Sequence, residues 1–303
     1  MEWWQAIVLG IVEGLTEYLP VSSTGHLILA QRAMGIPESE AANAYAICIQ
    51  AGAIAAVLGL YFARVKQMSR GLLGRDEDGL RLVRNVLAGF VPAAIAGLLL
   101  NDLIREYLFG GEQWGLWPTV LAWFLGGVAI LIVAWNRKRD TGSARSGLGI
   151  DDLTLRMALI IGVAQCIAMW PGVSRSLVTI VGGVLVGLSL PAAVEFSFLL
   201  GLVTLSAATA HDGVQYGDQI LGRYGTAEIL LGFVFAWLAA VIAVKWMVAY
   251  LNRHGLGVFG YYRVALAVVV ALLILADTFA SARSAPPVTS ATVPTVESPA
   301  PGR

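Results

Sequence analysis

Side chains that could do chemistry are concentrated in two short stretches of an otherwise apolar chain. The first runs from Glu13 to His26 and reads Glu-Gly-Leu-Thr-Glu-Tyr-Leu-Pro-Val-Ser-Ser-Thr-Gly-His. The second runs from Pro171 to Ser176 and reads Pro-Gly-Val-Ser-Arg-Ser, with Thr179 just beyond it. Ionisable groups at membrane depth are costly and normally mark function. We therefore expect the two stretches to meet in one site.

The two carboxylates of the first stretch, Glu13 and Glu17, lie four residues apart and hence on one face of a helix. Such a pair can hold a divalent cation through oxygen ligands, or it can divide the roles of general acid and general base. A polar face that lines water or caps a neighbouring helix is the alternative. Because both residues interrupt an apolar segment that should be buried, we favour the functional interpretation.

Three hydroxyl side chains follow the proline that ends this segment, at Ser22, Ser23 and Thr24. They open a second helical segment, of which Ser22 or Ser23 is the expected N-cap. Capping does not explain His26, which falls three residues after Ser23 and so on its face. A serine–histidine pair within reach is the arrangement of an activated nucleophile; alternatively, His26 itself attacks or relays a proton. A histidine that only packs is the remaining alternative.

The second stretch has the features of a phosphate site. Its Pro-Gly break exposes backbone N–H groups at a helix start, where these donors and the helix dipole bind phosphate. Ser174 and Ser176 lie beside them, and Thr179 lies one turn on. Arg175 adds a planar guanidinium that suits phosphate oxygens. An arginine that merely pairs with a glutamate of the first stretch is the alternative, and such a pair would itself draw the two stretches together.

The composition is that of a polytopic membrane protein. Hydrophobic residues make up 57% of the 303 residues and charged residues only 13%, whereas a soluble domain carries about 25% charged residues. The formal net charge is +0, and no nucleic-acid partner is expected. Cys48 and Cys166 lie in apolar segments without zinc-type spacing, so we expect small buried thiols rather than a disulfide framework.

Six apolar segments can cross a bilayer, which needs about 20 residues. We expect these spans at about 41–63, 85–101, 116–135, 191–211, 227–248 and 262–280. Four further apolar pieces are too short to cross, at 3–12, 27–33, 157–170 and 177–189. They flank the two polar breaks in pairs, which predicts two re-entrant helical hairpins surrounded by protein or water. One imperfect spanning helix is the alternative for the first pair.

Basic residues distinguish the two sides of the membrane. The loops 64–84 and 136–156 are rich in Lys and Arg and are predicted to be cytoplasmic, whereas 102–115 is predicted to lie outside. The same rule places 249–261 inside, and Arg263 is counted among the basic residues at its flank.

The two polar motifs form an internal repeat. Gly10-Ile11-Val12-Glu13 aligns with Gly162-Val163-Ala164-Gln165 at the offset that also pairs Ser22 with Ser174. The charge pattern gives the spans after the two motifs opposite directions. This is typical of an inverted-topology repeat, whose broken helices meet near the membrane midplane.

The predicted fold class is therefore an all-α polytopic membrane protein with about six transmembrane helices and two re-entrant hairpins. Residues 1–280 form one integral membrane domain, with repeat halves at about 1–140 and 150–280. Residues 281–303 are rich in Pro, Ser and Thr and are predicted to be a disordered tail.

Both stretches resemble motifs of the undecaprenyl-diphosphatase family, the BacA/UppP type of bacitracin resistance. Residues 13–26 are similar to the glutamate-rich motif of that family, and Pro171 to Thr179 is similar to its arginine motif. Glu195-Phe196-Ser197-Phe198-Leu199-Leu200 and Tyr261-Tyr262-Arg263 resemble two further family segments. The likeness covers roughly residues 3–280.

The resemblance implies a membrane phosphatase that removes the terminal phosphate of undecaprenyl diphosphate and regenerates the carrier lipid of peptidoglycan synthesis. Its implied partners are a polyprenyl diphosphate substrate, membrane lipids and a divalent cation (Mg²⁺ or Ca²⁺) held by Glu13 and Glu17. The predicted catalytic residues are Glu13, Glu17, Ser23 and His26, with Ser23 or His26 as the nucleophile. The predicted phosphate-binding residues are Ser22, Thr24, Ser174, Arg175, Ser176 and Thr179. Monomer and homodimer are both compatible with the sequence.

Two departures from the family pattern are visible. Leu177-Val178 replace the small residues usual before Thr179, which we expect to crowd the phosphate turn. Gly201-Leu202-Val203 replace a stretch that contains proline, a change we expect to be structural. Glu195, at the start of a span, is expected to support the site by contacting its residues rather than the substrate.

Transport of a lipid phosphate is the rival function, because inverted repeats with broken helices are a transporter architecture. A transporter has no need of a serine–histidine pair beside two carboxylates, so we favour hydrolysis. We expect the protein in the bacterial plasma membrane, with its site reached from the outer face.

Overall fold

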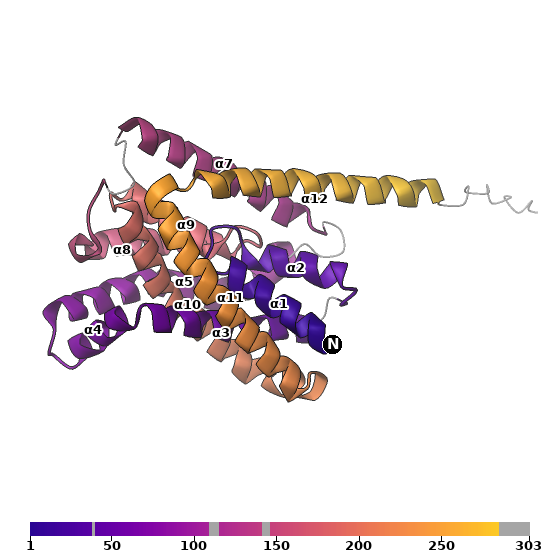
Figure 1. Cartoon of the computed structure of the whole chain (residues 1–303), viewed down its shortest axis with the longest axis horizontal. Helices are drawn as coiled ribbons and strands as arrows, with labels where there is room; N and C mark the ends of the chain where they lie inside the picture. Colours follow the sequence, from indigo (N-terminus) through magenta and orange to yellow (C-terminus); the bar gives the residue numbers. More distant parts are fainter. Residues whose placement is uncertain (38–39, 109–114, 141–145, 285–303) are drawn as a thin grey trace, which may run out of the picture.

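The computed structural model describes residues 1–37, 40–108, 115–140 and 146–284, and their secondary structure is helical (Figure 1). Among these residues no strand occurs beyond an isolated bridge between Leu148 and Leu188. The expected all-α fold is therefore confirmed for this part of the chain.

Two pairs of short helices flank the polar breaks, as the apolar pattern predicted. The first pair is α1 (Trp3–Thr16) and α2 (Ser23–Ala33). The second pair is α8 (Leu155–Gln165), which continues into the 3₁₀-helix η2 (Cys166–Met169), and α9 (Arg175–Leu185). The four α-helices have 11 or 14 residues each, too few for a crossing that needs about 20.

Five helices are long and apolar enough to cross a membrane: α5 (Glu77–Leu108), α7 (Trp117–Asp140), α10 (Leu190–Arg223), α11 (Thr226–His254) and α12 (Gly257–Ser284). The helices α3 (Glu40–Leu60) and α4 (Phe62–Leu72) meet at 81° and add a sixth crossing if they count as one broken span. The chain is thus a multi-pass membrane protein with five or six crossings in the part that the structure describes.

Several helices extend beyond the predicted spans. The segment 64–84, predicted as a loop, contains most of α4 and the start of α5. The helix α12 continues to Ser284, into the segment predicted as a tail, whose remainder, 285–303, lies outside the described residues. The charge pattern marks where an apolar segment ends. A helix can continue past that point because its backbone bonds are internal and its long charged side chains reach water.

The short helices recur at one spacing within the two predicted halves, residues 1–140 and 150–280, and pack against helices of the other segment. The same offset separates Trp3 from Leu155, where α1 and α8 begin, and Ser23 from Arg175, where α2 and α9 begin. The helix α1 packs against α11 of the second half, and α8 packs against α5 of the first. The helices α7 and α12 also pack together, and Figure 1 shows them along one edge of the molecule.

Corresponding glycines make these exchanged contacts possible. A Cβ atom on Gly10 of α1 would overlap the carbonyl oxygen of Gly232 in α11. A Cβ atom on Gly162 of α8 would overlap the carbonyl oxygen of Gly89 in α5 and lie 2.8 Å from its Cα. At both positions two helix backbones therefore touch, and a larger residue cannot fit without moving a helix.

We expect Gly162→Ala to destabilise the protein by about 1–3 kcal/mol, the usual cost of overpacking. Gly97→Ala is the matched control, because Gly97 lies in α5 and a Cβ there would meet no atom within 4 Å. In the control the higher helix propensity of alanine should leave stability unchanged or slightly raised. Thermal unfolding of both purified variants in detergent measures the difference, and equal stability would contradict the contact.

Candidate active site

Each polar break ends in a serine with a strained backbone. Ser22 has a φ of 75° and Ser174 a φ of 73°, and among the described residues other than glycine only these two have positive φ. Such conformations cost of order 1–3 kcal/mol and cluster at functional sites. Both serines are N-caps, so that Ser23 and Arg175 are the first residues of α2 and α9.

The carboxylate of Glu17 joins the two stretches. Its Oε2 accepts a hydrogen bond from the Ser23 hydroxyl, and its Oε1 accepts one from Nη2 of Arg175 at 3.3 Å. All three residues lie in or beside the breaks, and the ion pair is almost completely buried. The structure therefore brings the two stretches together, as predicted. It also shows the ion pair between Arg175 and a glutamate of the first stretch, which the sequence had offered as the alternative to phosphate binding.

The hydrogen-bond partner of Ser23 differs from the prediction. The spacing favoured a Ser23–His26 pair, whereas the Ser23 hydroxyl donates to Glu17. Glu17 is the C-cap of α1 and Ser23 the first residue of α2, so the two side chains meet across the break, in which Ser22 has a positive φ. A carboxylate that accepts the proton of a hydroxyl is itself a suitable base for a serine nucleophile.

The guanidinium of Arg175 is held from three sides. Nη1 donates to the Ser197 carbonyl of α10 at 2.9 Å, and the group lies 5.3 Å over the ring of Tyr18. Gly201 gives it room, because a Cβ atom at that position would overlap the guanidinium. The departure at Gly201 was expected to be structural only, but it faces this site. The buried Nε of Arg175 has no partner among the described residues, so the arginine retains a donor for a ligand.

The remaining hydroxyls of the second stretch tie elements together. Ser174 caps α9 at the N–H of Leu177, and Ser176 donates to the Leu19 carbonyl in the first break at 2.9 Å. Thr179 bonds the Ser197 hydroxyl at 2.6 Å. Ser176 and Thr179 are fully buried. These bonds join α9 to the first break and to α10, and the predicted contact of Ser176 and Thr179 with phosphate stays a prediction.

The other phosphate-binding candidates of the first stretch differ in exposure. Ser22 is buried and offers its carbonyl to His26, whereas Thr24 is exposed in the first turn of α2. Leu177 and Val178, expected to crowd the phosphate turn, belong to a hydrophobic core cluster. Their side chains therefore pack in the protein interior.

His26 has a partner on each ring nitrogen. Nδ1 lies 2.6 Å from the carbonyl oxygen of Ser22, and Nε2 lies 2.7 Å from the hydroxyl of Tyr262 in α12. The ring also stands edge-on to Trp123 of α7. His26 is thus fixed close to Glu17 and Ser23 in the chain, but on the side of α2 that faces α7 and α12.

Arg263 is a component of this region that the sequence reading assigned wrongly. It was counted among the basic residues flanking a loop, but it is 0% exposed. Nη1 donates to the Pro20 carbonyl at 3.4 Å, and Nη2 donates to the carbonyls of Ala122 and Gly172, each at 2.8 Å. One side chain therefore connects both breaks and α7. The signal that could have identified Arg263 is its position as a cation inside a predicted apolar span.

The residues that could hold a cation are the two glutamates. Glu13 is 1% exposed and contacts Glu17, and its Oε1 has no hydrogen-bond partner among the described residues. Two buried carboxylates in contact require a proton or a cation between them. Hard oxygen ligands of this kind suit Mg²⁺ or Ca²⁺, and Mg²⁺ in particular takes one or two carboxylates together with substrate phosphates. Among the described residues no group of three or more His, Cys, Asp or Glu side chains could hold a metal ion, so a cation at this pair would need further ligands from a phosphate or from water.

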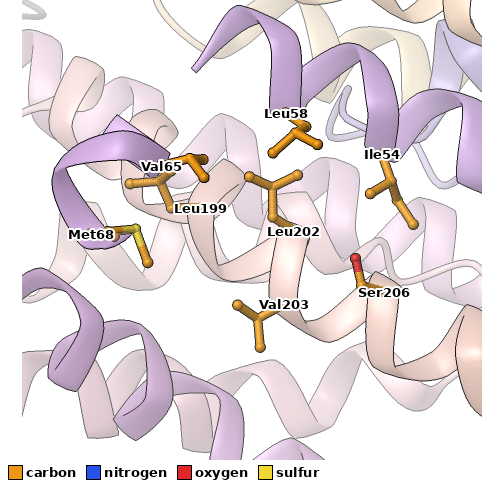
Figure 2. Close-up of a pocket in the computed structure, with 8 residues that line it drawn as sticks. All are labelled: Ile54, Leu58, Val65, Met68, Leu199, Leu202, Val203 and Ser206. Atoms are coloured by element: carbon orange, nitrogen blue, oxygen red, sulfur yellow. The ribbon is translucent and has the colours of Figure 1, made fainter. Parts of the chain in front are cut away.

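A separate apolar pocket lies between α3, α4 and α10. Figure 2 shows its lining side chains from α3, α4 and α10, which enclose a cavity of about 380 Å³: Ile54, Leu58, Val65, Met68, Leu199, Leu202, Val203 and Ser206. This lining is suited to hydrocarbon and not to phosphate. It comes from the face of α10 opposite Ser197 and Gly201, which contact Arg175.

Glu195 does not support the site. It forms an ion pair with Arg64 of α4 at 2.7 Å, and Arg64 also reaches Asp151 at 3.3 Å. The expectation that Glu195 backs the catalytic residues is therefore wrong, because its position on α10 directs it toward α4.

The chain is similar to a family of known proteins over most of its length. A family model described as "Bacitracin resistance protein BacA" matches residues 6–269. An "Undecaprenyl-diphosphatase" of Sorangium cellulosum (strain So ce56) is 44% identical over 273 residues, covering 89% of this chain and 86% of the relative. An "Undecaprenyl-diphosphatase" of Aquifex aeolicus (strain VF5) is 41% identical over 280 residues, covering 91% of this chain and 100% of the relative. The range matched by the family model includes both polar stretches.

Proposed function

The chain belongs to the bacitracin resistance protein BacA family, and we infer that it is an undecaprenyl-diphosphatase. It hydrolyses undecaprenyl diphosphate to undecaprenyl phosphate and inorganic phosphate, and so recycles the lipid carrier of peptidoglycan synthesis. The observation that carries this inference is the junction of Ser23, Glu17 and Arg175, which joins a hydroxyl, a base and a phosphate-binding cation in one buried place. Cell-wall biogenesis and bacitracin resistance are the roles we propose for it in the cell.

In the proposed reaction Ser23 attacks the terminal phosphorus. Its proton passes to Glu17, and the bond between the terminal phosphorus and the bridging oxygen breaks, which releases undecaprenyl phosphate. Water then hydrolyses the phosphoserine and releases inorganic phosphate. The support for Ser23, rather than His26, as the nucleophile is the hydrogen bond from its hydroxyl to Glu17. His26 is left to transfer a proton.

Arg175 stabilises the charge that develops on the terminal phosphate. Its position is fixed by Glu17 and Ser197 before substrate arrives, and preorganised charge of this kind is usually the largest single contribution to catalysis. Glu13 and Glu17 would hold the divalent cation, Mg²⁺ or Ca²⁺, which when bound would supply further positive charge at the phosphate oxygens.

We also propose that the two helix pairs are re-entrant hairpins of an inverted-topology repeat, with the site open to the outer side of the bacterial inner membrane. The common offset of the short helices, the matching serine turns and the exchanged packing of α1 and α8 support this arrangement. The diphosphate would occupy the polar junction while the prenyl chain stays among the spans and membrane lipids.

Transport of a lipid phosphate is the second candidate, because helices broken at matched positions are common in transporters. The experiment that separates the two is release of inorganic phosphate from a polyprenyl diphosphate by the purified protein, with and without divalent cation. We expect cation-dependent release that falls at least about 100-fold in Arg175→Ala, the size seen when one preorganised donor is removed.

Arg64→Ala is the matched control, since Arg64 also pairs with a glutamate but lies outside the site. It should retain release within about twofold, because partly exposed ion pairs contribute little. No release by folded wild-type protein with any cation would overturn the hydrolase, and translocation of a lipid phosphate in liposomes would then test the transporter.

A further inference from the structure

The two hydrogen bonds of His26 define which nitrogen carries its proton. The Ser22 carbonyl can only accept, so Nδ1 must be the donor in the 2.6 Å contact. In a neutral ring Nε2 then holds the lone pair, and the Tyr262 hydroxyl donates to it at 2.7 Å. No ion pair in the described part of the chain includes His26. The contacts therefore fit a neutral imidazole in the Nδ1–H tautomer.

Tyr262 also fixes the plane of the imidazole. The two rings are nearly parallel, with 9° between their planes and 5.8 Å between their centroids. Trp123 lies against the imidazole at a steep angle of 62°. The hydroxyl and the two aromatic rings together leave His26 one orientation, in which Nε2 is directed to the half-exposed Tyr262 and Nδ1 to the backbone of its own helix.

We propose that Tyr262 is a positioning residue of the reaction, which orients the His26 ring through its hydrogen bond to Nε2 and its parallel ring. The inference rests on the proposed hydrolase and deepens it. A lone pair on a defined nitrogen is what His26 needs to accept a proton from water. The Ser22 carbonyl keeps the proton on Nδ1, and the hydroxyl of Tyr262 keeps Nε2 aligned until a water molecule takes its place.

The neighbouring tyrosine supplies a matched control. Tyr261 precedes Tyr262 in α12, but it is 69% exposed against 45% for Tyr262, and no contact with His26 is made by it among the described residues. Tyr261→Phe and Tyr262→Phe remove the same oxygen from the same turn of one helix. Only the second removes a donor to Nε2.

The first measurement is the ¹⁵N spectrum of the histidine rings in the full-length protein. The chain has three histidines, His26, His211 and His254, and the resonances missing in His26→Gln assign those of His26. We expect the pattern of the Nδ1–H tautomer in wild type and in Tyr261→Phe. In Tyr262→Phe the Ser22 carbonyl still keeps the proton on Nδ1, so we expect the same tautomer with a shifted Nε2 resonance, because the hydroxyl that bonds this nitrogen is gone.

The second measurement is phosphate release from a polyprenyl diphosphate by the same proteins. Tyr262→Phe should lower kcat about three- to tenfold, as for loss of one hydrogen bond, with KM within about twofold of wild type. Tyr261→Phe should match wild type. An Nε2 resonance that is unchanged in Tyr262→Phe would overturn the proposal, and so would a shifted Nε2 resonance with unchanged kcat. If wild type released no phosphate while the ring signals behaved as expected, the hydrolase would fail and the ring geometry would stand.

Discussion

Glu17→Gln is expected to lower phosphate release at least about 1000-fold, within the range seen when a general base is removed. The substitution keeps the shape of the side chain but removes the negative charge. Ser23 then loses the group that takes its proton, and Arg175 loses its ion-pair partner. Glu13 also loses the carboxylate with which it would hold a cation. Because three functions meet on one carboxylate, no other single change in the site should cost more.

Inorganic phosphate released from a polyprenyl diphosphate in detergent measures this effect across a range of cation concentrations. Glu195→Gln is the matched control, because it neutralises a glutamate that pairs with an arginine away from the site. It should stay within about twofold of wild type. Since removing one partner of a buried pair can also unfold a protein, thermal unfolding must show that Glu17→Gln is folded. A folded variant that retains a tenth of wild-type activity would exclude Glu17 as the base.

The junction of the two stretches could be predicted from the sequence for a simple electrostatic reason. Glu17 and Arg175 are charges in segments too short to span and too apolar to be exposed. Charges in such places need partners of opposite sign, and the carboxylate of Glu17 and the guanidinium of Arg175 are such partners. The half-length helices followed from apolar length alone. The ion pair between them is therefore the part of the site that the amino-acid pattern determines.

The partner of Ser23 could not be predicted in the same way. Helical spacing places Ser23 and His26 on one face of α2, but that argument considers only residues within α2. It leaves out side chains from the end of α1, such as Glu17. Ser22, just before Ser23, has a left-handed φ of 75°. Serine has no preference for that region, so its sequence gives no sign of the turn. The turn, and not the spacing, selects Glu17 as the acceptor.

Arg263 illustrates a second limit, since its partners are backbone carbonyls. A cation that is satisfied by carboxylates can be matched to acidic residues along the chain, whereas carbonyl acceptors occur at every residue. The flank of a basic loop was therefore the natural interpretation of Arg263. The structure instead shows a fully buried guanidinium between the carbonyls of Pro20 and Gly172, one in each break. This contact suggests that Arg263 holds the two breaks at the spacing the site needs.

Arg263→Met is accordingly expected to destabilise the protein by at least about 2 kcal/mol, since buried carbonyls left without a donor cost about 1–3 kcal/mol each. The methionine fills much of the same space but donates no hydrogen bond. Thermal unfolding in detergent measures the loss. Arg253→Met, at an exposed arginine in the last turn of α11, is the control and should change stability by less than about 1 kcal/mol.

Arg263→Lys separates the charge from the connection between the breaks. A lysine keeps the cation, but its single ammonium lacks the planar fork with which arginine reaches acceptors on several sides. If the connection matters, Arg263→Lys should be folded yet release phosphate at least about tenfold more slowly, because displacements of about 1 Å at a reacting group can cost 100-fold. Full activity in Arg263→Lys would show that a buried positive charge is sufficient. The alignment of Ser23, Glu17 and Arg175 would then have to be maintained by their own hydrogen bonds, with Ser176 and its bond to Leu19 as the direct link between α9 and the first break.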